Sequence, residues 1–303
     1  GMQNLGNNLG KGGIWKSRDG GLTWENTTVQ PQQVINGDVT SQPLSQFYDY
    51  TDLVMAPNNP NVMYMAINDN FQGSETGLYR TTDGGVRWYR LSDHPTGQNV
   101  SRIRIAISDS NPNIVYSLIV DANANFSPNG GFAYLLMRST NGGITWQNTG
   151  TIPRPNLENF ESDFIQYGNG GRYAAAIAVD PNDSDVVWVG GSRLLRSADA
   201  GFSWTDQSAG SGAAHLTPIR ELRWDRTTAG ARLIAAGDGG IRRMSGLDSS
   251  GAGIWENLNS TLAIANTVAV DVNRFDENIV YTSNWHTGTL RFNDNTAWGQ
   301  IDA

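Results

Sequence analysis

The sequence predicts an all-β protein in which four-stranded antiparallel sheets recur as the blades of a β-propeller. Two observations carry this prediction: a glycine-rich turn motif that repeats along the 303 residues, and a β-rich hairpin phrase between its copies. The composition agrees, because 35 glycines, 10 tryptophans and 10 tyrosines suit short strands joined by tight turns better than long amphipathic helices.

The turn motif occurs in four copies that align without gaps. They are SRDGGLTW (17–24), TTDGGVRW (81–88), STNGGITW (139–146) and SADAGFSW (197–204). In this pattern the hydroxyl and carboxyl side chains can bond backbone groups inside the turn, and glycine accepts a positive φ. We expect the apolar residue and the tryptophan two positions later to share one face of the outgoing strand, with the indole wedged between neighbouring elements. The residues given this structural role are Ser17, Asp19, Gly21, Trp24, Asp83, Gly85, Trp88, Ser139, Asn141, Gly143, Trp146, Ser197, Asp199, Gly201 and Trp204.

A hairpin phrase lies between the turn motifs. An apolar run meets an Asp/Asn/Pro turn and then a second β-rich run, at 53–67, 105–119, 177–191 and 268–283, with a degenerate version at 222–237. One unit is therefore strand, polar turn, strand, loop, strand, glycine turn and strand. Four antiparallel strands that recur every 43 to 64 residues are typical of propeller blades.

The number of blades follows from the number of motifs. Weaker motif copies end at Trp255 and Trp298, so we expect five full blades and one outer hairpin around the first motif, in a ring of six or seven positions. The polar residues before the first motif are too few for two inner strands. Residues 1–303 are predicted to form a single propeller domain, either completed irregularly by its termini or a fragment of a longer protein.

The turn motif resembles the Asp-box, or BNR repeat, and the chain from about residue 12 to residue 300 is similar to Asp-box β-propellers. These include sialidases, xyloglucanase-type glycoside hydrolases, sortilin-type receptor domains and photosystem II assembly factors. The phrases AVDPNDSDVVWVGGSRLLRSADAGFSW and RLIAAGDGGIRRM are most similar to the xyloglucanase and sortilin-like group. The resemblance implies a fold more firmly than an activity.

Sialidase activity is not expected from this resemblance. The strings RIR (102–104) and IPRP (152–155) do not match the family's Arg-Ile-Pro motif in its expected place. Arg80, Arg138 and Arg196 each precede a turn motif, so their period indicates an outer-strand position rather than a convergent triad. Xyloglucanase-type enzymes place catalytic aspartates from two propellers across one cleft, whereas this chain holds the repeats of one.

Composition excludes several classes of partner. A net charge of −8 without a basic cluster argues against nucleic acid and anionic membrane surfaces. The absence of cysteine excludes disulfides and thiolate metal sites. His94, His215 and His286 lack metal-ligand spacing, and we expect neither a metal nor a cofactor. No apolar run is long enough for a membrane helix, and we expect a secreted or cell-surface protein whose signal peptide is absent from this sequence.

Candidate chemistry lies where the innermost strand of each blade begins, because those loops face the funnel of a propeller. The acids proposed there as catalytic are Asp49, Asp52, Glu161 and Asp163. The residues proposed to bind ligand are Tyr48, Tyr50, Phe160, Tyr167, Trp285 and His286. Carboxylates beside aromatic rings suit a sugar, and glycoside hydrolysis needs two acids, about 5–5.5 Å apart for retention or 6.5–9.5 Å for inversion. The alternative is that these are ordinary loop acids and hydrophobic plugs.

We therefore expect a propeller that recognises a polysaccharide or glycoprotein through its loop face. Long connections at 28–50, 68–77, 120–132 and 150–173 supply the loops in which binding usually resides. Two alternatives stay open: a glycoside hydrolase using paired carboxylates, and a scaffold that binds another protein or the rest of a longer parent chain.

Overall fold

The structure is a computed structural model of the chain. It describes residues 13–29, 33–35, 38–40, 49–68, 75–95, 100–121, 133–152, 175–191, 193–208, 219–226, 231–259, 267–272, 279–284, 288–293 and 298–300. Beyond residue 259 it describes the backbone strands but not their side chains. The chain divides into two compact units, Gly1–Val189 with Arg196–Thr205, and Gly190–Leu195 with Asp206–Ala303.

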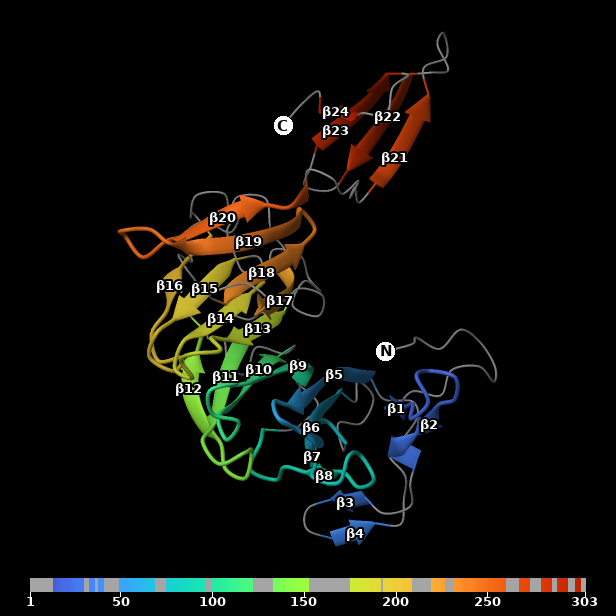
Figure 1. The fold of residues 1–303 in the computed structure, drawn as a ribbon, viewed down its shortest axis with the longest axis vertical. Helices are drawn as coiled ribbons and strands as arrows, with labels where there is room; N and C mark the ends of the chain where they lie inside the picture. Colours follow the sequence, from blue (N-terminus) through green and yellow to red (C-terminus); the bar gives the residue numbers. More distant parts are fainter. Residues whose placement is uncertain are drawn as a thin grey trace. The chain divides into compact units, whose positions relative to one another are not determined.

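The first unit opens with a two-stranded hairpin around the first turn motif. Its strands β1 (Trp15–Lys16) and β2 (Glu25–Asn26) pair antiparallel, and a 3-10 turn η1 (Thr27–Val29) follows. The hairpin expected around the first motif is therefore present (Figure 1).

A six-stranded sheet comes next. Its order is β4-β3-β8-β7-β6-β5, where the consecutive antiparallel strands are β5 (Asp49–Ala56), β6 (Asn59–Asn68), β7 (Gly77–Thr81) and β8 (Tyr89–Arg90). The short strands β3 (Gln33–Ile35) and β4 (Asp38–Thr40) extend the sheet beyond β8 through one parallel pair, Val34 with Tyr89. Part of the connection expected to be a binding loop at 28–50 thus joins the outer edge of a sheet.

Two four-stranded sheets follow in the chain. One is formed by β9 (Val100–Ile107), β10 (Val115–Asp121), β11 (Ala133–Ser139) and β12 (Gln147–Thr151). The other is formed by β13 (Ala176–Val179), β14 (Val187–Gly190), β15 (Leu194–Ser197) and β16 (Thr205–Asp206), and the division between the two units runs through its strands.

The second unit holds two more such sheets. The first contains β17 (Ile219–Asp225), β18 (Arg232–Gly237), β19 (Gly240–Leu247) and β20 (Gly253–Asn257). The second contains β21 (Thr267–Val272), β22 (Ile279–Asn284), β23 (Gly288–Asn293) and β24 (Trp298–Gln300). Each pairs its strands antiparallel in chain order (Figure 1).

These sheets confirm the predicted fold class. Within the described ranges every sheet but the first hairpin contains four consecutive antiparallel strands, and the regular structure outside strands is the single 3-10 turn. Each predicted hairpin phrase forms the first two strands of a sheet, as with β5 and β6. The chain is an all-β protein of the β-propeller type, and its number of blades stays a prediction. No helix in the described part has the length and apolar character that crossing a membrane requires.

Side chains hold each turn motif together. In the first motif the Ser17 hydroxyl accepts the Gly21 N–H at 2.7 Å and donates to the Asp19 carboxylate at 2.8 Å. Asp19 also accepts the Thr23 N–H at 2.9 Å. The same three bonds recur in the copies at 81–88, 139–146 and 197–204. The turn is thus specified locally, by the side chains that the pattern predicts to bond its backbone.

The expected strand face after each motif is wrong. The strand begins only after the tryptophan, so the apolar residue two positions earlier still lies in the turn. Leu22, Val86, Ile144 and Phe202 are therefore exposed, at 86%, 51%, 64% and 57%. The tryptophan instead folds back over the turn, and in the first and third copies its indole N–H donates to the carbonyl of the second glycine at 3.0 Å.

Burial of the motif tryptophan depends on the element before it in the chain. Trp88 is completely buried, in a cluster with Met65, Ile67 and Tyr79 that Ile14 of the first hairpin also packs against. Trp24, in that first hairpin, is 58% exposed. The predicted wedge between neighbouring elements therefore holds for Trp88 and does not hold for Trp24.

The arginines that precede the motifs lie on the third strand of their sheets. Arg80, Arg138 and Arg196 each place the guanidinium over a ring on the second strand, 5.8–5.9 Å from the ring centroid, and the rings belong to Tyr64, Tyr116 and Trp188. This packing accounts for the period of the arginines.

Candidate functional site

The structure describes three of the residues predicted to act at the site, and all three lie at the beginning of β5. They are Asp49, Tyr50 and Asp52. Tyr48, Phe160, Glu161, Asp163, Tyr167, Trp285 and His286 lie outside the described residues. Their proposed roles stay predictions.

A β-bulge shapes the beginning of β5. Tyr50 pairs with Ile67 and Asp52 pairs with Ala66, so Thr51 is an extra residue in the strand. Innermost strands β9, β17 and β21 carry an extra residue at the same end, namely Ser101, Arg220 and Val268. Bulges at strand ends change the direction of a side chain, and they are common next to active sites. Within the first unit, the repeated bulge marks the beginning of β5 and of β9 as the candidate site.

Asp52 is directed toward the next sheet of the first unit. Its Oδ2 accepts the Ile105 N–H of β9 at 2.8 Å, and its Oδ1 accepts the Leu53 N–H at 3.0 Å. The Arg104 Nε lies 3.7 Å from Oδ2, and the two side chains are 11% and 10% exposed. A carboxylate with these partners ties β5 to β9, which favours a structural role for Asp52 over proton transfer.

Asp49 has a more open position. It is the first residue of β5, it is exposed, and it stands opposite Asn68 of β6 in the sheet. Of Asp49 and Asp52, the two predicted catalytic acids that the structure describes, Asp49 is therefore the one that a bound molecule can reach.

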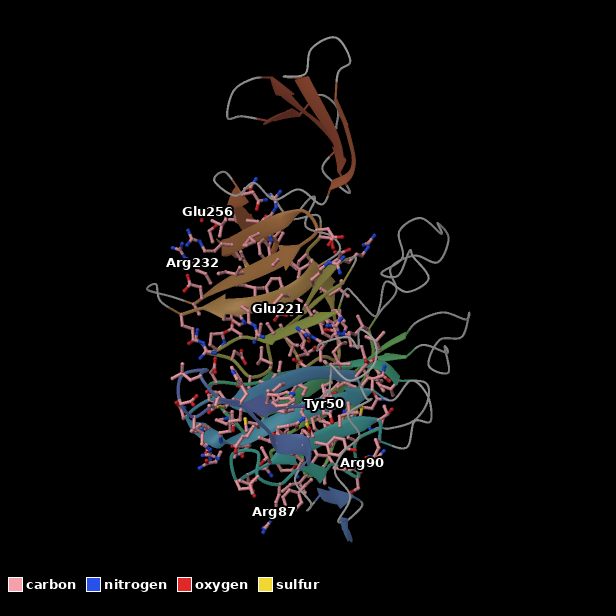
Figure 2. The ribbon with its side chains drawn as sticks, turned by 90° about the vertical axis from the view of Figure 1, so that its right-hand side faces the viewer. Tyr50, Arg87, Arg90, Glu221, Arg232 and Glu256 are labelled. Atoms are coloured by element: carbon pink, nitrogen blue, oxygen red, sulfur yellow. The ribbon has the colours of Figure 1, made fainter. Side chains whose placement is uncertain are left out.

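Tyr50 belongs partly to the core. It is half-buried and packs against the cluster that contains Met65, Ile67 and Tyr79, which leaves only part of its ring to a ligand. Figure 2 labels Tyr50 and Arg90, which come from β5 and β8 of the same sheet. A ring held in this way is positioned by the fold, so a sugar that stacks on it would meet a fixed surface.

Next to Tyr50 lies a polar cluster that sequence reasoning missed. The buried Tyr79 hydroxyl donates toward the Glu75 backbone oxygen at 2.9 Å and its carboxylate at 3.0 Å. Burial raises the pKa of Tyr79, and the Glu75 charge raises it further. Arg90 Nη2 donates to the Thr76 carbonyl at 2.8 Å. Glu75 is half-buried at this end of the sheet and adds a second carboxylate there, and only the contact with Tyr79, not the local sequence pattern, singles it out.

The second unit has its own charged group at the corresponding end of a sheet. The bulged Arg220 of β17 binds Asp238 through two nitrogens, at 2.5 and 3.1 Å, and Asp238 lies in the glycine turn between β18 and β19. Hydrogen bonding to Asp238 raises the pKa of Arg220. Glu221, labelled in Figure 2, pairs with Arg223 at 2.9 Å. Asp238 is 10% exposed, and the GDGG string of the sequence was the signal that could have singled it out.

Among the described residues, no group of three or more His, Asp or Glu side chains is placed to hold a metal ion. The chemistry that these residues offer is that of carboxylates, a guanidinium and aromatic rings, the groups that recognise sugar hydroxyls and ring faces.

Sequence comparison finds relatives among polysaccharide-degrading enzymes. The chain is 25% identical over 210 residues to a xyloglucanase of Paenibacillus sp, a match that covers 64% of this chain and 18% of that enzyme. It is 25% identical over 215 residues to xyloglucanase Xgh74A of Acetivibrio thermocellus, covering 66% of this chain and 23% of that one. The chain thus spans about a fifth of the length of these relatives. No protein-family model matches it.

A solved structure supports the fold. The crystal structure of an ancestral GH74 enzyme superposes with a TM-score of 0.55 at 20% identity, covering 96% of this chain and 38% of that one. The repeated sheets and these similarities define the class of the chain, a β-propeller similar to glycoside hydrolases.

Proposed function

We propose that this chain is a secreted polysaccharide-binding β-propeller of the Asp-box class, and that the binding face is the end at which the innermost strands begin. The observation that carries the proposal is the similarity to two xyloglucanases, because it covers about two thirds of the chain. Asp49, Tyr50 and Glu75 support it, since they bring carboxylates and a fixed ring to one end of a sheet.

A β-glucan with neutral side branches, such as xyloglucan, is the ligand that the relatives' names suggest. Such a chain offers many hydroxyls, which are hydrogen-bond donors to carboxylates, and apolar ring faces, which stack on aromatic side chains. The overall charge of −8 agrees with an uncharged ligand and disfavours an anionic one.

Binding can be measured by affinity electrophoresis in gels that contain xyloglucan or mixed-linkage β-glucan. We expect retardation of the unaltered chain, and weaker retardation for Asp49→Asn, Tyr48→Ala and Tyr167→Ala. Tyr89→Ala is the matched control, because Tyr89 is an aromatic residue that is 36% exposed and lies on β8, which two strands separate from β5 in the sheet. A chain that no tested glucan retards would contradict the proposal.

Glycoside hydrolysis is the second candidate function, and the xyloglucanase relatives favour it. The described part of the candidate site offers Asp49 and Glu75 as carboxylates at one end of a sheet, and hydrolysis requires a pair. Release of reducing ends from xyloglucan by the unaltered chain, abolished by Asp49→Asn or Asp163→Asn at glucan concentrations that saturate the variant, would establish an enzyme. Binding without release would leave recognition alone.

A further inference from the structure

A buried histidine joins two sheets of the first unit. His94 lies in the turn 91–95 that follows β8, and its side chain is 2% exposed. The turn is fixed to its own sheet by the Leu91 N–H, which donates to the Leu78 carbonyl at 2.9 Å. From there the His94 ring reaches into the next sheet, where Nε2 lies 2.8 Å from the Ser117 Oγ of β10.

The hydrogen-bond partners of His94 determine which ring nitrogen carries the hydrogen in the neutral form. Nδ1 lies 3.0 Å from the Pro95 carbonyl oxygen, which can only accept, so Nδ1 carries the hydrogen. In a neutral ring Nε2 is then an acceptor, and the Ser117 hydroxyl donates to it. Ser117 is completely buried, so this bond forms out of contact with water.

The same turn also holds the tryptophan of the third motif. The His94 and Trp146 rings meet edge to face, with centroids 5.0 Å apart and an interplanar angle of 83°. The Asp93 Oδ2 accepts the Trp146 N–H at 2.7 Å. Asp93 is the charged group that acts on His94, while β10 and the third motif face it with uncharged Ser117 and Trp146. Three contacts therefore join the sheet of β5–β8 to the sheet of β9–β12, and His94 makes two of them.

We propose that His94 is an acid-operated latch between the sheet of β5–β8 and the sheet of β9–β12, closed while the ring is neutral and released when it is protonated. Protonation places a hydrogen on both ring nitrogens, so Nε2 changes from acceptor to donor and the Ser117 hydroxyl must rotate to accept from it. It also places a positive charge where water is excluded, and this desolvation is what opens the latch, although the nearby Asp93 carboxylate offsets part of it.

The pH range follows from the two states. Burial lowers the pKa of His94 from its ordinary 6.5 to about 4, although the Pro95 carbonyl and Asp93 favour the charged form. Between pH 6.5 and pH 4, the His94 ring binds a proton when the turn 91–95 is detached from the sheet of β9–β12 and stays neutral when the turn is in place. The attached state is therefore fully stable above pH 6.5 and loses stability as the pH falls toward 4. Over this range the opening constant rises on the order of a hundredfold.

Amide hydrogen exchange, corrected for the intrinsic effect of pH, tests the latch. In the unaltered chain we expect the Trp146 amide to lose protection on the order of a hundredfold between pH 7 and 4.5. The Thr145 amide beside it should change little, because it donates to the non-titrating Asn141. His94→Gln should remove the pH dependence of Trp146, whereas Asp93→Asn, which leaves the imidazole in place, should retain it.

Two results would overturn the proposal. One is an unchanged pH dependence of the Trp146 amide in His94→Gln. The other comes from nitrogen NMR of the His94 ring in the unaltered chain, which should show Nε2 without a hydrogen down to about pH 4, well below the ordinary histidine pKa of 6.5. A ring that already carries both hydrogens near pH 6, while the Trp146 amide keeps its protection, would exclude the latch.

Discussion

The Tyr64 hydroxyl donates to the Gly142 carbonyl oxygen at 2.8 Å, across 78 positions of the sequence. Tyr64 lies on β6 and is 1% exposed, while Gly142 lies in the turn motif of the following sheet. The Gly142 N–H in turn donates to the Asn113 carbonyl at 2.8 Å. One glycine of the motif is thus bonded on one side to its own sheet and on the other to the sheet before it.

The preceding repeat has the same arrangement with another donor. Lys16 Nζ donates to the Gly84 carbonyl at 2.8 Å, and the Gly84 N–H donates to the Asn61 carbonyl at 2.9 Å. In these two copies the motif therefore closes its own turn and also presents a carbonyl to which the preceding element binds. In the fourth repeat the equivalent tyrosine, Tyr116, donates instead to the Ser184 carbonyl at 2.8 Å.

Removing the Tyr64 hydroxyl tests this connection. Tyr64→Phe should lower the free energy of unfolding by about 1–2 kcal/mol, because the buried Gly142 carbonyl loses its donor. Urea unfolding followed by tryptophan fluorescence measures the change. Tyr89→Phe, at an exposed position on β8, is the control and should have little effect. Equal stability of the two variants would show that the bond contributes nothing.

Trp88 and Trp24 are the most and the least buried of the described motif tryptophans, and comparing them gives a second prediction. Trp88→Ala should cost about 3–5 kcal/mol, because it empties a fully buried site between Tyr79, Met65 and Ile14. Trp24→Ala should cost less than about 1 kcal/mol, since that indole is 58% exposed. Comparable losses in urea unfolding would mean that Trp24 is covered in solution.

The acidic residue of the motif yields a third prediction, for which Asn141 is a natural control. Asn141 Oδ1 accepts from the Ser139 hydroxyl and the Thr145 N–H, both at 2.9 Å. Asp199→Asn should therefore retain the turn, whereas Asp199→Ala should lower the thermal midpoint and the protection of the Ser203 amide. Matching midpoints for the two variants would refute this role of the side-chain oxygen.

The same carboxylate has a defined pH dependence. Hydrogen bonds from Ser203 hold the pKa of Asp199 below its ordinary 3.8. The stabilisation is therefore present above that value and is lost as the pH falls through the lower, folded pKa. Asp199→Asn should abolish this acid-dependent step in the Ser203 amide exchange.

Backbone geometry at the motif gives a fourth prediction. A Cβ at Gly201, where φ is +96°, would lie 2.4 Å from Leu136 Cδ2 and 2.9 Å from Thr149 Oγ1. Gly201→Ala should then cost more than about 2 kcal/mol. At Gly20, φ is +73° and nothing lies within 4 Å of the added atom. Gly20→Ala should cost about 1 kcal/mol. Ala200, with φ +61°, already occupies the equivalent position of the fourth motif. Thermal unfolding of the pair would contradict the prediction if Gly20→Ala were the more damaging.

The repeat made the sheets predictable from sequence, because Ser17, Asp19 and their equivalents specify each turn by bonds within eight residues. The addition of β3 and β4 to β8 was not predictable, since QVI and DVT are short strands inside a polar connection. The exposure of Trp24 was missed for a related reason: burial depends on the neighbouring sheet, which the motif itself does not encode.

The strand that carries three of the candidate residues was predictable from sequence, and the surroundings of those residues were less so. Sequence order placed Asp49, Tyr50 and Asp52 at the start of an innermost strand, and the structure has them there. The bulge at Thr51 is a property of two paired strands and cannot be seen in one of them. That bulge separates the surroundings of Asp49 and Asp52, which stand three positions apart in the sequence.

This separation gives the last prediction. Asp52 is 10% exposed and accepts the Ile105 N–H beside Arg104, so Asp52→Ala would leave a buried guanidinium and a backbone donor with fewer acceptors. We expect a loss of about 3 kcal/mol in the free energy of unfolding. Asp52→Asn should lose less, because an amide oxygen can still accept the Ile105 N–H. Asp49→Asn, at an exposed position, should leave stability nearly unchanged and weaken retardation by xyloglucan. If Asp52→Asn instead kept full stability and abolished release of reducing ends, Asp52 would be a catalytic acid and its structural role would be refuted.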